Sequence, residues 1–369
     1  MPGTQQLPKH YLSYLDSARG IAALMVLFYH FITWHYDNLI YAKLASFIFN
    51  GRDAVSFFFV LSGFVLSYKY IVLKKPLDVK KFFINRFLRL FPAFFVTVLV
   101  CILYRQMAIL HFHNLARLSI FTKTEFWEEI YLFKAHTRNY GAGWTLVIEL
   151  TISFFMPFII AIAKVNRKLV SWLLITVILI MAVMNDFFVH FILGILASCY
   201  FFEITDKSFR QTKWYKYRIP LVIAAFILFS VRVIDNIVPF GSTYNYIASY
   251  FTINFFFFSG IGSFIFLVVI LQNKKIQNIL NHSVLRFYGK ISYDIYLMHW
   301  IVVTVIFEQW DEILKVFHDR AKLAFLLTFI AYFITTTILA TLVHYTIELP
   351  FIRFGKKITS TMKPFIVIE

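Results

Sequence analysis

An arginine and a histidine lie within one apolar stretch near the N-terminus, LDSARGIAALMVLFYHF at residues 15–31. Arg19 and His30 are 11 residues apart, so on a helix they differ by about 20° in direction and about 16 Å along the axis. A guanidinium binds phosphates, and a neutral imidazole takes up a proton near neutral pH. Because a charge at membrane depth is costly in lipid, we expect this stripe to face protein or a water-filled cavity. The alternative is that Arg19 reaches the headgroups and His30 lies at the outer interface.

Further charged residues lie in later apolar segments. The segment GAGWTLVIELTISFFMP contains Glu149, and INRFLRLFPAFF contains Arg86 and Arg89. A buried carboxylate can orient an imidazole, but an ion pair between Glu149 and Arg52 is the alternative. For Arg86 and Arg89, the enrichment of basic residues at the cytoplasmic face of membrane proteins is a complete alternative explanation.

Other polar or aromatic side chains are candidates for lining a cavity. They come from the segments FFVLSGFVLSY, WTLVIE and ISYDIYLMHW, and they are Ser62, Trp144, Tyr293, Asp294 and His299. The small residues around Ser62 are equally consistent with close helix packing, and His299 is a candidate second base. Because no histidine and carboxylate spacing resembles a metal site, we expect no metal.

Ten apolar segments must position these side chains. The chain has 369 residues, of which 60% are hydrophobic, and a mean hydropathy of +0.72, too apolar for a soluble fold. A spanning helix needs roughly 20 predominantly apolar residues. We therefore predict an all-α polytopic membrane protein with a single domain over residues 1–369. The expected spans lie near residues 12–34, 53–73, 90–111, 142–163, 169–185, 187–204, 219–235, 246–271, 291–307 and 323–346.

The distribution of lysine and arginine orients these spans. With the N-terminus inside, 24 of the 36 basic residues fall on the inner side and 11 on the outer side, while Arg19 lies within a span. Because cytoplasmic loops are enriched in basic residues, we expect both termini to be cytoplasmic. The formal net charge of +17 is then mostly a topology signal and predicts no nucleic-acid partner. The loop at 112–141 is expected outside, and its aromatic residues favour an interfacial helix.

Taken in order, these motifs resemble the acyltransferase-3 family of integral membrane O-acyltransferases, over essentially the whole chain. The spacing of Arg19 and His30 resembles the family's defining motif, and WTLVIE is similar to its tryptophan, serine, leucine and glutamate motif. Thr145 stands where serine is usual, which retains a hydroxyl. The C-terminal extracytoplasmic hydrolase-like domain of some members is not found. We therefore expect a stand-alone membrane domain that completes transfer alone or with a separate partner.

The resemblance implies a donor, an acceptor and roles for the site residues. The donor would be acetyl-coenzyme A or another acyl-coenzyme A from the cytoplasm, with its phosphates bound by Arg19, Arg86 and Arg89. His30 would act as general base on the acceptor hydroxyl, and Glu149 would orient it.

The acceptor implied is a cell-surface polysaccharide, such as lipopolysaccharide, capsule or exopolysaccharide, or its lipid-linked precursor. The protein is then expected among the lipids of a bacterial cytoplasmic membrane. The alternative function is a transporter or flippase of lipid-linked glycans. Internal repeats would favour that alternative, and the sequence shows none.

Overall fold

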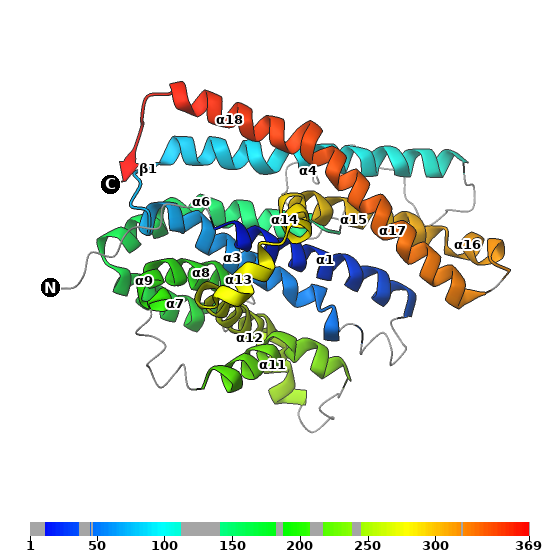
Figure 1. The fold of residues 1–369 in the computed structure, drawn as a ribbon, viewed down its shortest axis with the longest axis horizontal. Coiled ribbons are helices and arrows are strands. Elements are labelled where there is room, and N and C mark those ends of the chain that lie inside the picture. The colour runs from blue at the N-terminus through cyan, green and yellow to red at the C-terminus, as the bar shows by residue number, and fades with distance from the viewer. Residues whose placement is uncertain are drawn as a thin grey trace. The chain divides into compact units, whose positions relative to one another are not determined.

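The structure of the chain is a computed structural model that describes residues 12–36, 45, 47–111, 141–181, 187–206, 217–237, 245–318 and 320–368. Over these residues the chain forms helices and one pair of short strands (Figure 1). It divides into two compact units that interleave along the sequence. The first unit is Met1–Val79, Phe154–Lys290 and Ile366–Glu369, and the second is Lys80–Ser153 and Ile291–Phe365. The expectation of a single domain stays a prediction.

The first unit is a set of apolar helices. Asn50 caps the N-terminus of its α3, because the Asn50 side-chain oxygen accepts the backbone N–H of Asp53 at 3.2 Å. The elements are α1 (Ser13–Tyr36), α3 (Gly51–Ile71), α7 (Arg167–Met181), α8 (Phe188–Cys199), α9 (Phe201–Thr205), α11 (Arg218–Ile237), α12 (Asn245–Gln272), α13 (Lys274–Leu280), α14 (Ser283–Lys290) and the part of α6 (Gly143–Val165) from Phe154 onward.

Helices α3 and α8 approach each other closely because glycine stands at their contact. A Cβ added to Gly63 would lie 2.2 Å from the carbonyl oxygen of Phe191, and one added to Gly194 would lie 2.0 Å from the carbonyl oxygen of Val60. Nearby, the Ser67 hydroxyl lies 2.7 Å from the carbonyl oxygen of Gly63. Small residues allow this kind of backbone approach between apolar helices. The sequence offered two explanations for the small residues of α3, lining of a cavity and close helix packing. Close helix packing explains Gly63.

Two short strands close the first unit. Strands β1 (Leu77–Asp78) and β2 (Val367–Ile368) pair antiparallel, with Leu77 opposite Ile368. The ammonium of Lys164, near the end of α6, lies 3.0 Å from the carbonyl oxygen of Ile368 and 3.2 Å from that of Lys75. The C-terminal strand is thus held by both backbone pairing and a charged side chain.

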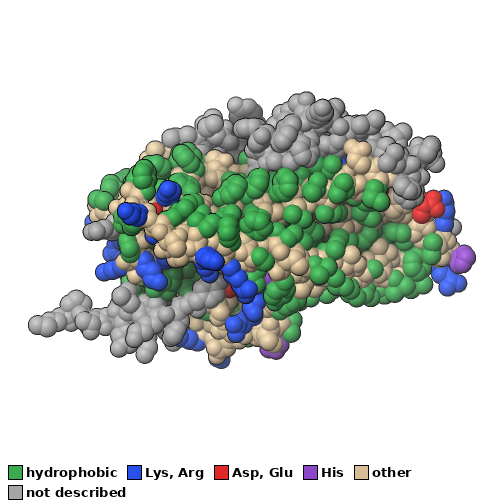
Figure 2. Space-filling model, turned by 90° about the horizontal axis from the view of Figure 1, so that it is seen from above, with side chains coloured by type: hydrophobic (Ala, Val, Ile, Leu, Met, Phe, Trp, Pro, Cys, Tyr) green, Lys and Arg blue, Asp and Glu red, His purple; other side chains and the backbone are tan. Residues whose placement is uncertain are grey.

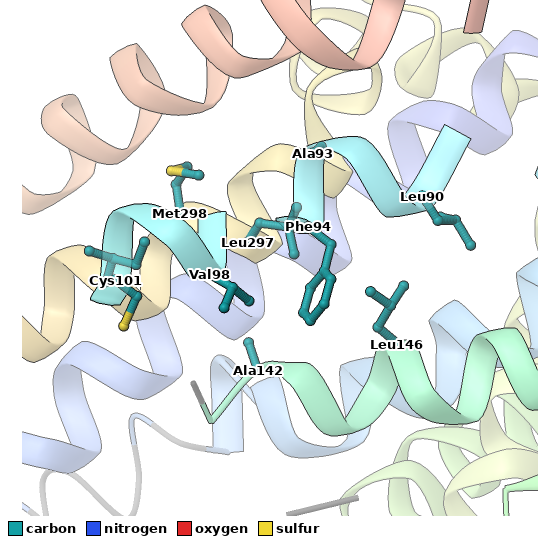
Figure 3. Close-up of a cluster of buried hydrophobic side chains, with 10 residues drawn as sticks. Leu90, Ala93, Phe94, Val98, Cys101, Ala142, Leu146, Leu297 and Met298 are labelled. Atoms are coloured by element: carbon teal, nitrogen blue, oxygen red, sulfur yellow. The ribbon is translucent and has the colours of Figure 1, made fainter. Parts of the chain in front are cut away.

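The second unit is built around an apolar core shared by three helices. Leu90 and Phe94 come from α4, Leu146 from α6, and Leu297 and Met298 from α15, and all are buried (Figure 3). The elements are α4 (Val79–His111), the part of α6 up to Ser153, α15 (Ser292–Glu308), α16 (Trp310–Val316), α17 (Ala321–Val343), the π-helical turn η3 (His344–Glu348) and α18 (Leu349–Thr361).

The π-helical turn ends at Glu348, two residues before Pro350. A proline inside a helix has no N–H for the carbonyl four residues earlier, here that of Thr346, and its ring clashes with that carbonyl. Widening the turn is one way to accommodate this, and such π-turns occur often at functional sites. Beyond it, α18 runs beside the first part of α4 (Figure 1), where Gly355 faces Asn85 and Leu88.

Five helices in the described residues are long and apolar enough to cross a membrane, or up to seven if two bent helix pairs each count as one span. The bend between α12 and α13, within the first unit, is 95°. Helices α8 and α11 contribute shorter apolar segments. Figure 2 shows a face on which hydrophobic side chains predominate. An all-α multi-pass membrane protein is supported, whereas ten spans and cytoplasmic termini stay predictions.

Candidate functional site

Arg86 and Glu149 form a partly buried ion pair in the second unit. Arg86 on α4 donates through Nη2 to Oε1 of Glu149 on α6, and its Nε donates to the Ser153 hydroxyl at 3.0 Å. The Ser153 hydroxyl is 2.6 Å from the carbonyl oxygen of Glu149. A spacing of four residues places Glu149 and Ser153 on one face of α6, so both contact the same guanidinium.

This ion pair bears on two alternatives raised by the sequence. The guanidinium that pairs with Glu149 in the second unit is that of Arg86, whereas the sequence suggested Arg52. The side chain of Arg86 is only 8% exposed, which is unusual for a basic residue that serves only to orient the chain at the headgroups. Glu149 belongs to the second unit and His30 to the first. The orientation of His30 by Glu149 therefore stays a prediction.

Arg89 lies one turn further along α4 and is half-buried. It is near enough to Glu348 to interact electrostatically with that carboxylate. On α15, Tyr293 donates its hydroxyl to the carbonyl oxygen of Leu90 on α4 at 2.7 Å. Tyr293 therefore joins α15 to α4 through a hydrogen bond to the backbone.

The tryptophan and threonine of the WTLVIE motif lie at the start of α6. Thr145 is buried, with its hydroxyl 3.0 Å from the Tyr296 hydroxyl and 3.1 Å from the carbonyl oxygen of Ala142. Trp144 is half-buried. His299 is buried on α15, with Nδ1 2.7 Å from the carbonyl oxygen of Tyr296. The hydroxyl at position 145 is thus used in a hydrogen bond between α6 and α15.

His30 and Arg19 lie on α1 in the first unit. His30 Nδ1 is 3.0 Å from the carbonyl oxygen of Val26. When Nδ1 carries the proton that this carbonyl accepts, the neutral ring has its lone pair on Nε2, the nitrogen that a general base would use. Ser62, on α3 of the same unit, is half-buried.

Arg19 is held where α1 meets α14. Its Nη1 is 3.7 Å from Oδ1 of Asp16, and its side chain is 14% exposed. A Cβ added to the adjacent Gly20 would lie 2.6 Å from the backbone nitrogen of Gly289 on α14. Arg19 is therefore packed against protein on at least one side, as expected for a cation inside an apolar helix.

Asp294, His344 and Glu348 form a buried cluster, of which the sequence analysis named only Asp294, as a cavity-lining candidate. His344 Nδ1 lies 2.6 Å from Oε2 of Glu348 and 3.2 Å from Oδ2 of Asp294. The segment HYTIE carries the available signal, a histidine four residues before a glutamate. The partner from α15, 50 residues earlier, is brought in only by the fold. The aromatic loop of the sequence analysis lies outside the described residues, apart from Gly141.

A family model described as an acyltransferase domain matches residues 12–345. The chain belongs to the acyltransferase-3 family. The matched range contains Arg19, His30, Arg86, Arg89 and Glu149. Together with the apolar helices, this membership supports a multi-pass membrane protein.

Two relatives support the family membership. The chain is 28% identical over 163 residues to nodulation protein 10 of Rhizobium leguminosarum. This match covers 40% of this chain and 44% of the relative. The chain is also 31% identical over 107 residues to the peptidoglycan O-acetyltransferase OatA of Listeria monocytogenes. This match covers 28% of this chain and 15% of the relative. The matched segments thus span less than half of either relative. No solved structure matches the chain.

Proposed function

We propose that this acyltransferase moves an acyl group, most simply acetyl, from cytoplasmic acyl-coenzyme A to a hydroxyl of a bacterial cell-surface polysaccharide or its lipid-linked precursor. The observation that carries the proposal is the family match over residues 12–345. A second observation is the similarity to a peptidoglycan O-acetyltransferase, which favours oxygen as the acceptor atom. We place the protein in the bacterial cytoplasmic membrane with both termini inside.

We assign His30 as the general base. Its Nε2 takes the proton of the acceptor hydroxyl while that oxygen attacks the thioester carbonyl carbon. The tetrahedral intermediate collapses with cleavage of the C–S bond, and the thiolate of coenzyme A leaves. The imidazolium returns the proton to the sulfur. The products are the ester and the free thiol, so no metal, oxidant or other co-reactant is required.

We assign Arg19, Arg86 and Arg89 to the phosphates of the donor. Each guanidinium can donate two parallel hydrogen bonds to a phosphate. Arg86 already donates to Glu149 and Ser153, so its orientation is fixed before a ligand arrives. Glu149 is then a positioning residue for Arg86, and its carboxylate keeps this buried cation paired.

The transport alternative has less support. A transporter or flippase of lipid-linked glycans would also contain many apolar helices and buried arginines. The family match, however, is to an acyltransferase domain. A transporter has no use for a thioester donor, so the binding of acyl-coenzyme A by purified protein separates the two functions.

Two measurements test the proposed function. Mass spectrometry of surface glycans from a deletion strain should show loss of O-linked acetyl groups, restored by the parental gene and not by His30→Gln. Calorimetry with purified protein should show binding of acetyl-coenzyme A. Unchanged glycan acylation in the deletion strain, or no binding of any acyl-coenzyme A, would overturn the proposal.

A further inference from the structure

The cluster of Asp294, His344 and Glu348 offers three ligand atoms from two elements of the second unit. One imidazole nitrogen and one oxygen from each carboxylate lie within 4.8 Å of one another. The side chains are 0%, 10% and 4% exposed for Asp294, His344 and Glu348. Buried titratable groups of this kind are expensive unless they are paired or coordinate a metal.

The hydrogen bonds within the cluster leave one buried atom unsatisfied. His344 Nδ1 lies near both carboxylates, but Oδ1 of Asp294 has no hydrogen-bond partner among the residues that the structure describes. Such an unsatisfied group is destabilising, and more so when it is charged. Because Asp294 is fully buried, its second oxygen is a candidate ligand atom inside the cluster.

We propose that Asp294, His344 and Glu348 bind a divalent first-row transition-metal ion such as Zn²⁺. Imidazole and carboxylate donors suit this class of ion, whereas Mg²⁺ and Ca²⁺ prefer oxygen ligands alone. Three protein ligands leave a coordination position for water or another ligand. The site goes beyond the acyl-transfer function and requires no part of it.

The distances are close to those of a metal site. Tetrahedral Zn²⁺ with bonds of roughly 2.0–2.2 Å keeps its ligand atoms roughly 3.4 Å apart. The separation of 3.2 Å between His344 Nδ1 and Asp294 Oδ2 meets this, and the 2.6 Å contact to Glu348 must lengthen. Binding releases the proton from Nδ1 to solvent, since a metal ligand must be deprotonated. The wider π-helical turn at His344–Glu348 sets the spacing of two of the three ligands.

The competing arrangement is an ion-pair network without a metal. In it, an imidazolium of His344 and the guanidinium of Arg89, which acts on Glu348, balance the two carboxylates. That network needs Arg89 as a permanent counter-ion and a proton shared between the carboxyl groups of Asp294 and Glu348. It predicts a protein that contains no ion and does not respond to chelators, which makes the two arrangements distinguishable by measurement.

The test is the metal content of the full chain, purified in detergent with no polyhistidine tag, stripped with chelator, exposed to Zn²⁺ and desalted. We expect about one ion per chain by inductively coupled plasma mass spectrometry, and less than a fifth of that in His344→Ala and Glu348→Gln. His282→Ala is the matched control because His282 is an exposed histidine of the same chain, and it should keep the parental content.

A second readout guards against variants that fail to fold. Chelator should lower the denaturation temperature of the parent and of His282→Ala, because an ion that binds only the folded state stabilises it. It should not change that of folded Glu348→Gln, which is nearly isosteric. Three results would each overturn the proposal. The first is clearly less than one zinc ion per chain in the folded parent, and the second is an equal zinc content in the parent and Glu348→Gln. The third is an unchanged denaturation temperature of the parent after addition of chelator.

Discussion

Glu149 accepts a hydrogen bond from the guanidinium of Arg86, and the two side chains join α6 to α4 within the second unit. The pair is more than a contact between two charges, because Ser153 accepts a further hydrogen bond from Nε of the same guanidinium. The carboxylate and the hydroxyl together fix the orientation of this guanidinium. The WTLVIE segment, which contains Glu149, is thereby linked to Arg86 of α4.

Breaking the ion pair from one side should destabilise the protein. Glu149→Ala leaves the buried guanidinium of Arg86 without its carboxylate, which costs about 1–3 kcal/mol because water reaches the partly exposed position 149. The double variant Glu149→Leu with Arg86→Met should recover much of this loss, because neither charge remains. Denaturation in detergent measures both. Equal stability of Glu149→Ala and the parent would contradict the pairing.

Arg19→Ala should weaken the binding of acyl-coenzyme A, because it removes one of the cations proposed to bind the donor phosphates. Arg286→Ala is the matched control, since Arg286 is an exposed arginine of α14 in the same unit. Calorimetry should show a loss of at least about tenfold for Arg19→Ala, the size of one charge-assisted hydrogen bond. If both variants bind the donor equally well, Arg19 serves only the structure.

Close packing of α3 against α8 should make Gly194 intolerant of a side chain. Gly194→Ala places a Cβ 2.0 Å from the carbonyl oxygen of Val60, so the helices must separate, with an expected cost of about 1–3 kcal/mol. Gly355→Ala is the control, because its nearest neighbours lie at 3.2 Å and are side-chain atoms. The denaturation temperature should fall clearly for Gly194→Ala and little for Gly355→Ala. A similar change in both would refute the packing argument.

Both termini should be cytoplasmic, because 24 of the 36 basic residues fall on one side of the ten-span arrangement. A reporter fused after Lys363 should register inside the cell. A cysteine introduced in the loop at 112–141 should react with a membrane-impermeant reagent from outside. An external signal from the fusion at Lys363 would reverse the orientation.

Much of the helical architecture could be predicted from hydropathy, and the described part of the chain has a helix at each of the ten expected places. The boundaries were less predictable. The third span was expected to begin near residue 90, but α4 begins at Val79. Its first turns contain basic residues such as Lys80 and Arg86, and a search for apolar windows excludes them although they continue the helix.

The candidate site was predictable only where it follows a motif. Glu149 and Arg86 were singled out as charges within apolar segments, yet their pairing depends on how α4 and α6 pack, and the sequence carries no register for that. His344 and Asp294 are 50 residues apart. Their contact follows from the packing of η3 against α15, which local spacing does not reveal.

The most direct test of the account is the rate of acyl transfer to the native acceptor by His30→Gln. Glutamine keeps the size and hydrogen bonding of the side chain but cannot take up a proton, so the rate should fall by roughly two to four orders of magnitude. Binding of acyl-coenzyme A should be retained, because the proposed phosphate ligand Arg19 lies about 16 Å away along α1. Transfer by a folded His30→Gln variant at more than about a tenth of the parental rate would contradict the assignment of His30 as the general base.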